Sequence, residues 1–150
     1  VSLEGECRHI TSYLQIQQVR YQDILTYDVD IPEEIANCKI PKITLQPLVE
    51  NALYHGIKNK RGKGRIVVTG RREKDKCVIR VEDNGIGMTK ERLNQVRGGL
   101  TTKIEDSNDF YGLYNVNERI RLKFGEGYGL SIDSVLQEGT CVEVWLPWES

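Results

Sequence analysis

The chain has 150 residues, of which 39% are apolar and 29% charged, and its formal net charge is −1. This size suits one globular domain with a substantial core and leaves little room for two. The near-neutral charge argues against a nucleic-acid surface, and no apolar run approaches the ~18 residues that cross a bilayer.

The first predicted element is a helix over residues 3–19, and the second is a strand over residues 24–31. The helix follows from apolar residues at near-helical spacing: Leu3, Cys7, Ile10, Leu14 and Ile16. The strand follows from strict alternation of apolar and polar residues, which Pro32 ends. Residues 35–42 are predicted to form a turn or a single helical turn.

A second helix is predicted from Thr44 to Gly56. Thr44 can cap its start, and its first turn tolerates Pro47 because the first four N–H groups lack internal partners. Asn51 and His55, four positions apart, share one face, while Gly56 suits the left-handed conformation that ends helices. The buried side is expected to consist of Leu45, Leu48, Val49 and Ala52.

Residues 65–70 and 77–82 are predicted to form an antiparallel hairpin. Asp83 continues the inward-facing set of the second strand, where a carboxylate needs either a protein donor or a ligand with an N–H group. Gly85 and Gly87 follow at once, and they permit positive φ angles and close approach of a flat ligand to the backbone. Taken alone, this segment favours a strand that ends in a simple Asn-Gly turn, and only its neighbours strengthen the ligand-binding interpretation.

The remaining segments complete an α/β pattern. Thr89 is predicted to cap a short helix, and residues 97–111 are predicted to form a long loop of the kind that serves as a lid. A helix from Gly112 to Gly125 and strands over residues 128–135 and 140–146 follow. We therefore expect a two-layer α/β (α+β) sandwich, with a mixed sheet of about five strands and helices on one face.

Four motifs in this order resemble the N, G1, G2 and G3 boxes of the Bergerat ATP-binding fold, found in histidine kinases, gyrase-type topoisomerases, the heat-shock chaperone and mismatch-repair ATPases. They are Glu50-Asn51-Ala52 with His55-Gly56, Asp83 to Met88, Tyr111-Gly112-Leu113, and Glu138-Gly139-Thr140. Residues 13–21, 45–56 and 112–119 are similar to LytS/YesM-like sensor histidine kinases of two-component systems. The resemblance covers nearly the whole chain.

The resemblance implies a site for ATP and Mg²⁺. Asp83 would accept a hydrogen bond from the adenine amine, Thr140 would help to hold a water beside it, and Asn51 would offer Mg²⁺ an amide oxygen. Glu50, Asn51 and His55 are the implied catalytic residues, with Asn51 as the metal ligand. The implied nucleotide-binding residues are Asn51, Tyr54, His55, Lys58, Asp83, Gly85, Ile86, Gly87, Met88, Thr101, Thr102, Tyr111, Gly112, Leu113 and Thr140.

Three positions depart from the family pattern. Phe110 stands where the G2 box commonly has its first glycine, and Tyr54 stands where a lysine often follows Asn51. Hydrolytic members carry an acidic general base one helical turn before the asparagine, and this chain has Pro47 there, which cannot accept a proton. The third departure favours transfer to another acceptor over hydrolysis.

The phosphoacceptor motif of these kinases, Pro-His-Phe-Leu-x-Asn, does not occur in the sequence. We therefore expect residues 1–20 to be a helix carried over from an upstream phosphoacceptor region, and residues 21–150 to form the catalytic domain. The implied partners are that upstream region, a response regulator and a second copy in the full-length protein. Four widely spaced cysteines without a Cys-x-x-Cys pair predict a reduced, cytosolic compartment, and the resemblance implies the cytoplasmic domain of a membrane-anchored sensor.

Two other functions are compatible with the same boxes. One is a nucleotide-binding or docking module without transfer activity, which the substitutions at Phe110 and Tyr54 suggest. The other is a serine/threonine protein kinase of the anti-sigma type. Saturable binding of an ATP analogue in Mg²⁺ separates the docking module from both kinases.

Overall fold

A computed structural model of the chain describes residues 1–21, 24–57, 63–100 and 111–148. Its helical elements are α1 (Leu3–Arg20), η1 (Glu33–Ile35), α2 (Leu45–Asn51), η2 (Ala52–Ile57), α3 (Lys90–Gly99) and α4 (Tyr111–Phe124). Its strands are β1 (Leu25–Asp30), β2 (Gly64–Glu73), β3 (Lys76–Asp83), β4 (Gly129–Val135) and β5 (Gly139–Pro147). The order of helices and strands agrees with the order predicted from the sequence.

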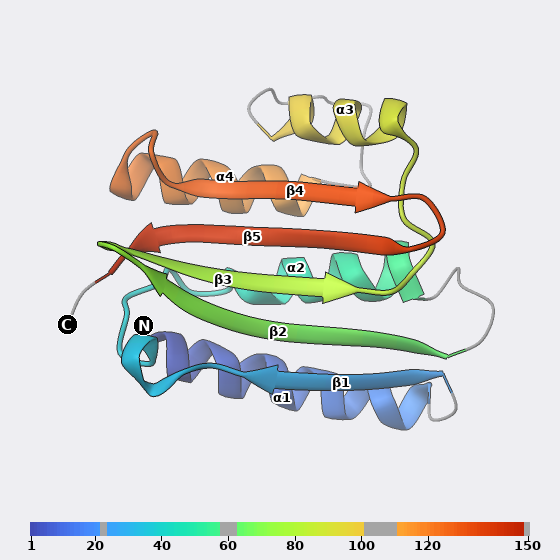
Figure 1. Cartoon of the computed structure of the whole chain (residues 1–150). Coiled ribbons are helices and arrows are strands. Elements are labelled where there is room, and N and C mark those ends of the chain that lie inside the picture. Colours follow the sequence, from blue (N-terminus) through green and yellow to red (C-terminus); the bar gives the residue numbers. More distant parts are fainter. Residues whose placement is uncertain (22–23, 58–62, 101–110, 149–150) are drawn as a thin grey trace.

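The five strands form one mixed sheet in the order β1-β2-β3-β5-β4. β1 pairs with β2 in parallel, and the other three pairs are antiparallel. Helices α1, α2 and α4 lie against one face of the sheet, and α3 lies beside the edge strand β4 (Figure 1). The predicted two-layer α/β sandwich with a mixed five-stranded sheet is confirmed.

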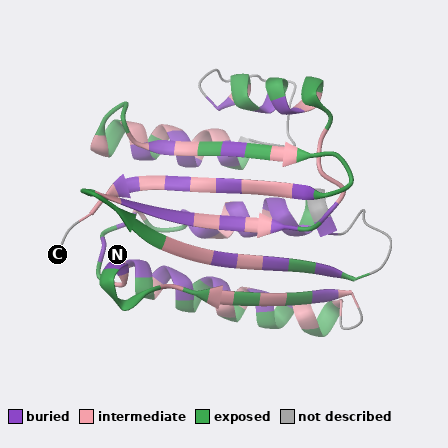
Figure 2. Cartoon of the chain, in the orientation of Figure 1, coloured by how far each residue is buried: buried purple, intermediate pink, exposed green. Residues whose placement is uncertain are grey.

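The core lies between the sheet and these helices (Figure 2). Alternate residues of the central strands supply the sheet side of it, namely Ile66, Val68, Cys77, Ile79, Val81, Val142, Val144 and Leu146. From α1, the side chains of Leu3, Ile10 and Leu14 are fully buried in the same core. Residues 1–20 therefore pack as part of the same folded body as the rest of the chain.

The start of α2 differs from the prediction. Thr44 does not cap the helix with its side chain, because its hydroxyl donates to the carbonyl of Pro41 at 2.6 Å. Instead the carboxylate of Glu6, which is 5% exposed, accepts from the backbone N–H groups of Ile43, Thr44 and Leu45 at 3.0, 3.1 and 3.3 Å. A carboxylate from α1 thus satisfies the N–H groups that a helix start leaves unpaired.

Two other boundaries also differ. Helical structure continues past Gly56, because the chain widens into the π-helical turn η2 after α2. The segment predicted to be a loop begins as the last turn of α3, which Arg97 fixes by donating to the carbonyl of Ile132 on β4 at 3.0 Å. Leu100 follows as a buried residue, and its carbonyl accepts from the amide of Asn117 at 2.8 Å.

Candidate functional site

Three polar residues form one row across the sheet. Asp83 is the last residue of β3 and lies opposite Thr140 on β5, which in turn lies opposite Ser134 on β4. Directly opposed residues have Cβ atoms about 4.5–5.5 Å apart. On each strand, every second residue faces the helices, and each of the three residues occupies one of these positions. Asp83 is 9% exposed. The sequence predicted Asp83 and Thr140 as site residues, and the sheet register brings them together.

Ser134 connects this row to the loop after β3. Its hydroxyl accepts from the backbone N–H of Met88 at 2.9 Å, donates to the carbonyl of Gly139 at 2.9 Å, and lies 2.8 Å from the Thr140 hydroxyl. The sequence analysis did not identify Ser134. Its position two residues after the buried Ile132, on the inward face of a predicted strand, was the available signal.

The loop after β3 is held by backbone contacts on both sides. The Asp83 carboxylate accepts from the N–H of Gly85 at 2.8 Å, and the Ile86 carbonyl accepts from the N–H of Gln137 at 2.6 Å. Gly87 has φ +68°, and a Cβ there would overlap the carbonyl oxygen of Val135. The glycine is therefore required by contact with the β4–β5 turn, whatever its role toward a ligand.

Asn51 is the last residue of α2 and is 8% exposed. Within the part of the chain that the structure describes, its side-chain oxygen Oδ1 is buried and has no hydrogen-bond partner. The turn that follows Asn51, η2, packs against β2, β3 and β5 (Figure 1). A buried amide oxygen without a partner is costly, and it fits a cation ligand such as Mg²⁺.

Glu50 lies on the side of α2 near α1. Its carboxylate accepts from the Gln46 amide at 2.8 Å, and the Gln46 oxygen lies 2.5 Å from Nε2 of His9. Burial, then the neighbouring Tyr54 hydroxyl and the Glu50 carboxylate, raise the pKa of Tyr13 above its usual range. Glu50 and Tyr54 therefore both lie near Tyr13 of α1.

The G2 residues lie where α4 begins. Gly112 sits against Pro47, one helical turn before Asn51, and Leu113 is buried in the core. The side chains of His55 and Tyr111 lie outside the described residues, as do Lys58, Thr101, Thr102, Lys103 and Phe110. The roles assigned to these residues stay predictions.

Comparison with known proteins identifies the family. Residues 41–150 match the family described as histidine kinase-, DNA gyrase B-, and HSP90-like ATPases. The chain belongs to this family. Among relatives, the sensor histidine kinase YesM of Bacillus subtilis is 36% identical over 148 residues, covering 98% of this chain and 24% of YesM.

Other similar proteins agree. The sensor histidine kinase BtsS of Escherichia coli K12 is 32% identical over 148 residues, covering 99% of this chain and 24% of BtsS. The sensor protein LytS of Staphylococcus saprophyticus is 34% identical over 150 residues, covering 100% of this chain and 25% of LytS. This chain thus spans about a quarter of the length of the curated relatives it matches.

Solved structures of histidine kinases share the fold. The catalytic domain of the histidine kinase ThkA superposes with a TM-score of 0.72 at 12% identity, covering 99% of this chain and 94% of ThkA. The histidine kinase domain of the blue-light activated EL346 kinase of Erythrobacter litoralis gives 0.67 at 16% identity, covering 99% of this chain and 66% of that domain. Family membership and fold together make this chain an ATP-binding catalytic domain of the histidine kinase type.

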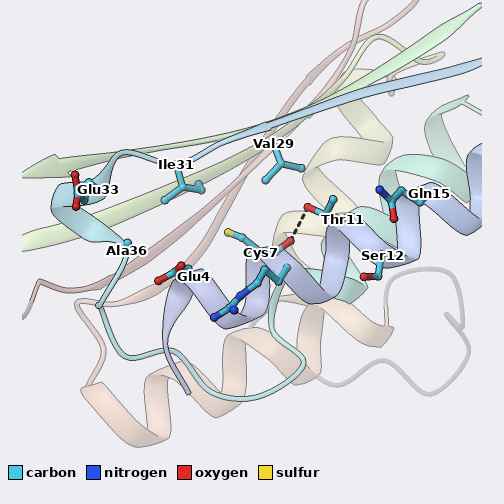
Figure 3. Close-up of a pocket in the computed structure, with 10 residues that line it drawn as sticks. Glu4, Cys7, Thr11, Ser12, Gln15, Val29, Ile31, Glu33 and Ala36 are labelled. Carbon is cyan, nitrogen blue, oxygen red and sulfur yellow. Dashed lines mark hydrogen bonds between the residues drawn. The ribbon is translucent and has the colours of Figure 1, made fainter.

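Two of the hollows lined by the described residues lie on the sheet and beside α1. One, of about 220 Å³, is lined by Asp83, Ser134 and Thr140 and also by Arg80, Glu82, Asp133 and Cys141, which alternate with them along the strands and point to the opposite face of the sheet. The other, of about 680 Å³, lies between α1 and the edge strand β1 and includes Cys7 and Thr11 (Figure 3). The first contains two predicted adenine-binding residues, and the second is built from other elements.

No helix within residues 1–21, 24–57, 63–100 and 111–148 has the length and apolar character needed to cross a membrane.

Proposed function

We propose that this chain is the catalytic part of a sensor histidine kinase, which transfers the γ-phosphoryl group of Mg·ATP to a histidine of an upstream region. One observation carries the proposal: the buried Asp83 carboxylate lies opposite Thr140 in a sheet against which η2, the turn that follows Asn51, packs. A carboxylate there can accept from the adenine amine, whereas guanine would present a carbonyl at that ring position.

In the proposed reaction, a lone pair of the acceptor imidazole forms the P–N bond. The bond between the γ-phosphorus and the bridging oxygen breaks, ADP leaves with that electron pair, and the proton of the imidazole is lost to a base. Asn51 would hold Mg²⁺ through Oδ1, and the metal would neutralise charge on the phosphates. Gly112, near the start of α4, would direct N–H groups toward them.

Transfer rather than hydrolysis is supported by Pro47, which occupies the position of the general base in hydrolytic relatives and cannot activate water. Glu50 is proposed to polarise the acceptor histidine. Its carboxylate is oriented by Gln46 on the side of α2 near α1, so it would meet an acceptor that approaches from that side. If so, Glu50→Gln abolishes transfer and leaves nucleotide affinity unchanged.

The wider role is also a proposal. We infer a two-component system in which residues 1–20 come from the phosphoacceptor region and residues 21–150 form the catalytic domain. The full-length protein would be a membrane-anchored homodimer with this domain in the cytoplasm, and it would pass the phosphoryl group to a response regulator. The names of the relatives, which are sensor kinases, support this inference.

Nucleotide binding is tested by titrating the chain with a non-hydrolysable ATP analogue, with and without Mg²⁺. We expect saturable, Mg²⁺-dependent binding that Asp83→Asn weakens at least about tenfold, since a donor amide would replace an acceptor oxygen. Asn51→Ala should remove the Mg²⁺ dependence. Glu82→Gln, on the opposite face of β3, is the matched control and should bind as the unmodified chain does. No saturation at millimolar nucleotide would favour a docking module.

Transfer is tested in the full-length protein by following label from the γ-phosphate. Label on histidine is lost in acid and retained in base, whereas label on serine or threonine is stable in acid. Acid-labile label confirms the histidine kinase, and acid-stable label would point to the anti-sigma type of kinase instead.

A further inference from the structure

We propose that Ser134 is a positioning residue that sets the preference of this site for adenine, by holding the Thr140 hydroxyl beside Asp83. The inference rests on the proposed function, because it concerns how the same site would recognise its nucleotide. It assigns a role to a residue that the four sequence boxes do not include.

The hydrogen bonds of Ser134 leave it nothing to offer a ligand. A hydroxyl has one proton and two lone pairs. The Met88 N–H can only donate and the Gly139 carbonyl can only accept, at 2.9 Å each. The Ser134 proton therefore goes to Gly139, and its second lone pair remains for the Thr140 hydroxyl at 2.8 Å. All three positions are used by the protein, so Ser134 acts through its neighbours.

Those neighbours belong to two different parts of the proposed site. Met88 closes the G1 loop that follows Asp83, and Gly139 and Thr140 form the G3 box at the start of β5. Gly139 also packs directly on the Asp83 backbone, where a Cβ would overlap the Asp83 carbonyl oxygen. One side chain on β4 thus fixes the distance between the loop and the strand that would face the base.

The row formed by Asp83, Thr140 and Ser134 explains why the hydrogen bonds of Ser134 would affect nucleotide specificity. Asp83, Thr140 and Ser134 are consecutive cross-strand partners on the helix-covered side of the sheet. Within the described residues, Ser134 provides the one hydrogen bond recorded for the Thr140 hydroxyl. Without Ser134 this hydroxyl loses the partner that fixes its orientation, although Thr140 itself stays opposite Asp83, at the position that distinguishes an amine from a carbonyl.

The test compares ATP with inosine triphosphate, which carries a carbonyl in place of the adenine amine and lacks the additional amine of GTP. Both affinities are measured by equilibrium titration of the 150-residue chain in Mg²⁺. We expect the chain to prefer ATP and Ser134→Ala to reduce that preference about three- to tenfold, the value of one hydrogen bond. Affinity for inosine triphosphate should change little.

Three further variants separate positioning from general damage to the fold. Ser134→Thr keeps the hydroxyl and should retain the preference, while Ser131→Ala, exposed on the same strand, is the matched control. In a Thr140→Val background, Ser134→Ala should cause no further loss of preference, because it acts through Thr140. If Ser134→Ala does not fold, Ser134→Cys, a poor hydrogen-bonding group of similar size, must show the same reduction.

The outcomes are distinct. Equal weakening of both nucleotides by Ser134→Ala, or an unchanged preference, overturns the role of Ser134 even if ATP binds well to the unmodified chain. A chain that binds neither nucleotide refutes the proposed function itself.

Discussion

Replacing Glu6 by alanine should destabilise the fold through the start of α2. The carboxylate accepts three backbone N–H bonds at 3.0–3.3 Å, is 5% exposed, and comes from a helix some 37 or more residues away in the sequence. Losing an N-cap acceptor costs about 0.5–2 kcal/mol, and leaving buried N–H groups unpaired costs about 1–3 kcal/mol. We expect Glu6→Ala to lower the free energy of unfolding by about 3 kcal/mol.

This loss is measured by denaturant or thermal unfolding monitored by circular dichroism. For a domain of this size, about 3 kcal/mol corresponds to a decrease in Tm of roughly 6–12 °C. Glu6→Gln keeps an acceptor oxygen without the charge, and its stability should lie between that of the unmodified chain and that of Glu6→Ala. Glu4→Ala, the same change at an exposed position in the same helical turn, should stay within about 0.5 kcal/mol of the unmodified chain. Equal stabilities of the Glu6→Ala and Glu4→Ala variants would refute the reasoning.

Two further predictions concern stability. Gly87→Ala should lower the free energy of unfolding by about 1–3 kcal/mol, because φ is +68° and the new Cβ would overlap the Val135 carbonyl. Gly127→Ala, at a position with open space around it, should lower it little. Denaturant titration measures both variants, and equal losses would contradict the packing argument. Burial, then Glu6 and Glu4, raise the pKa of the Cys7 thiol to about 11 from 9.0. The contribution of the protonated Cys7 thiol to the free energy of unfolding is therefore complete below pH 9 and is lost as pH rises toward 11. The free energy of unfolding should thus decrease between pH 8 and pH 10.5, and it should decrease less in the Cys7→Ala variant.

The sequence alone determined the element types and much of the site. The alternation that leads into Asp83 made β3 recognisable, and the four boxes identified the candidate residues with their family. These signals are readable because helix and strand periods are local properties of the chain, and because turns need particular residues. Even the absence of a general base at Pro47 could be read without coordinates.

Only the tertiary structure decided which side chains meet. Glu6 replaces Thr44 as the cap of α2, Ser134 joins two boxes, and Gln46 connects Glu50 to His9 of α1. Each of these contacts depends on how one element packs or registers against another far along the chain, and local periodicity carries no information on that pairing. Gly87 illustrates the difference: its freedom of backbone was predictable, but the partner that requires it, the β4–β5 turn, was not.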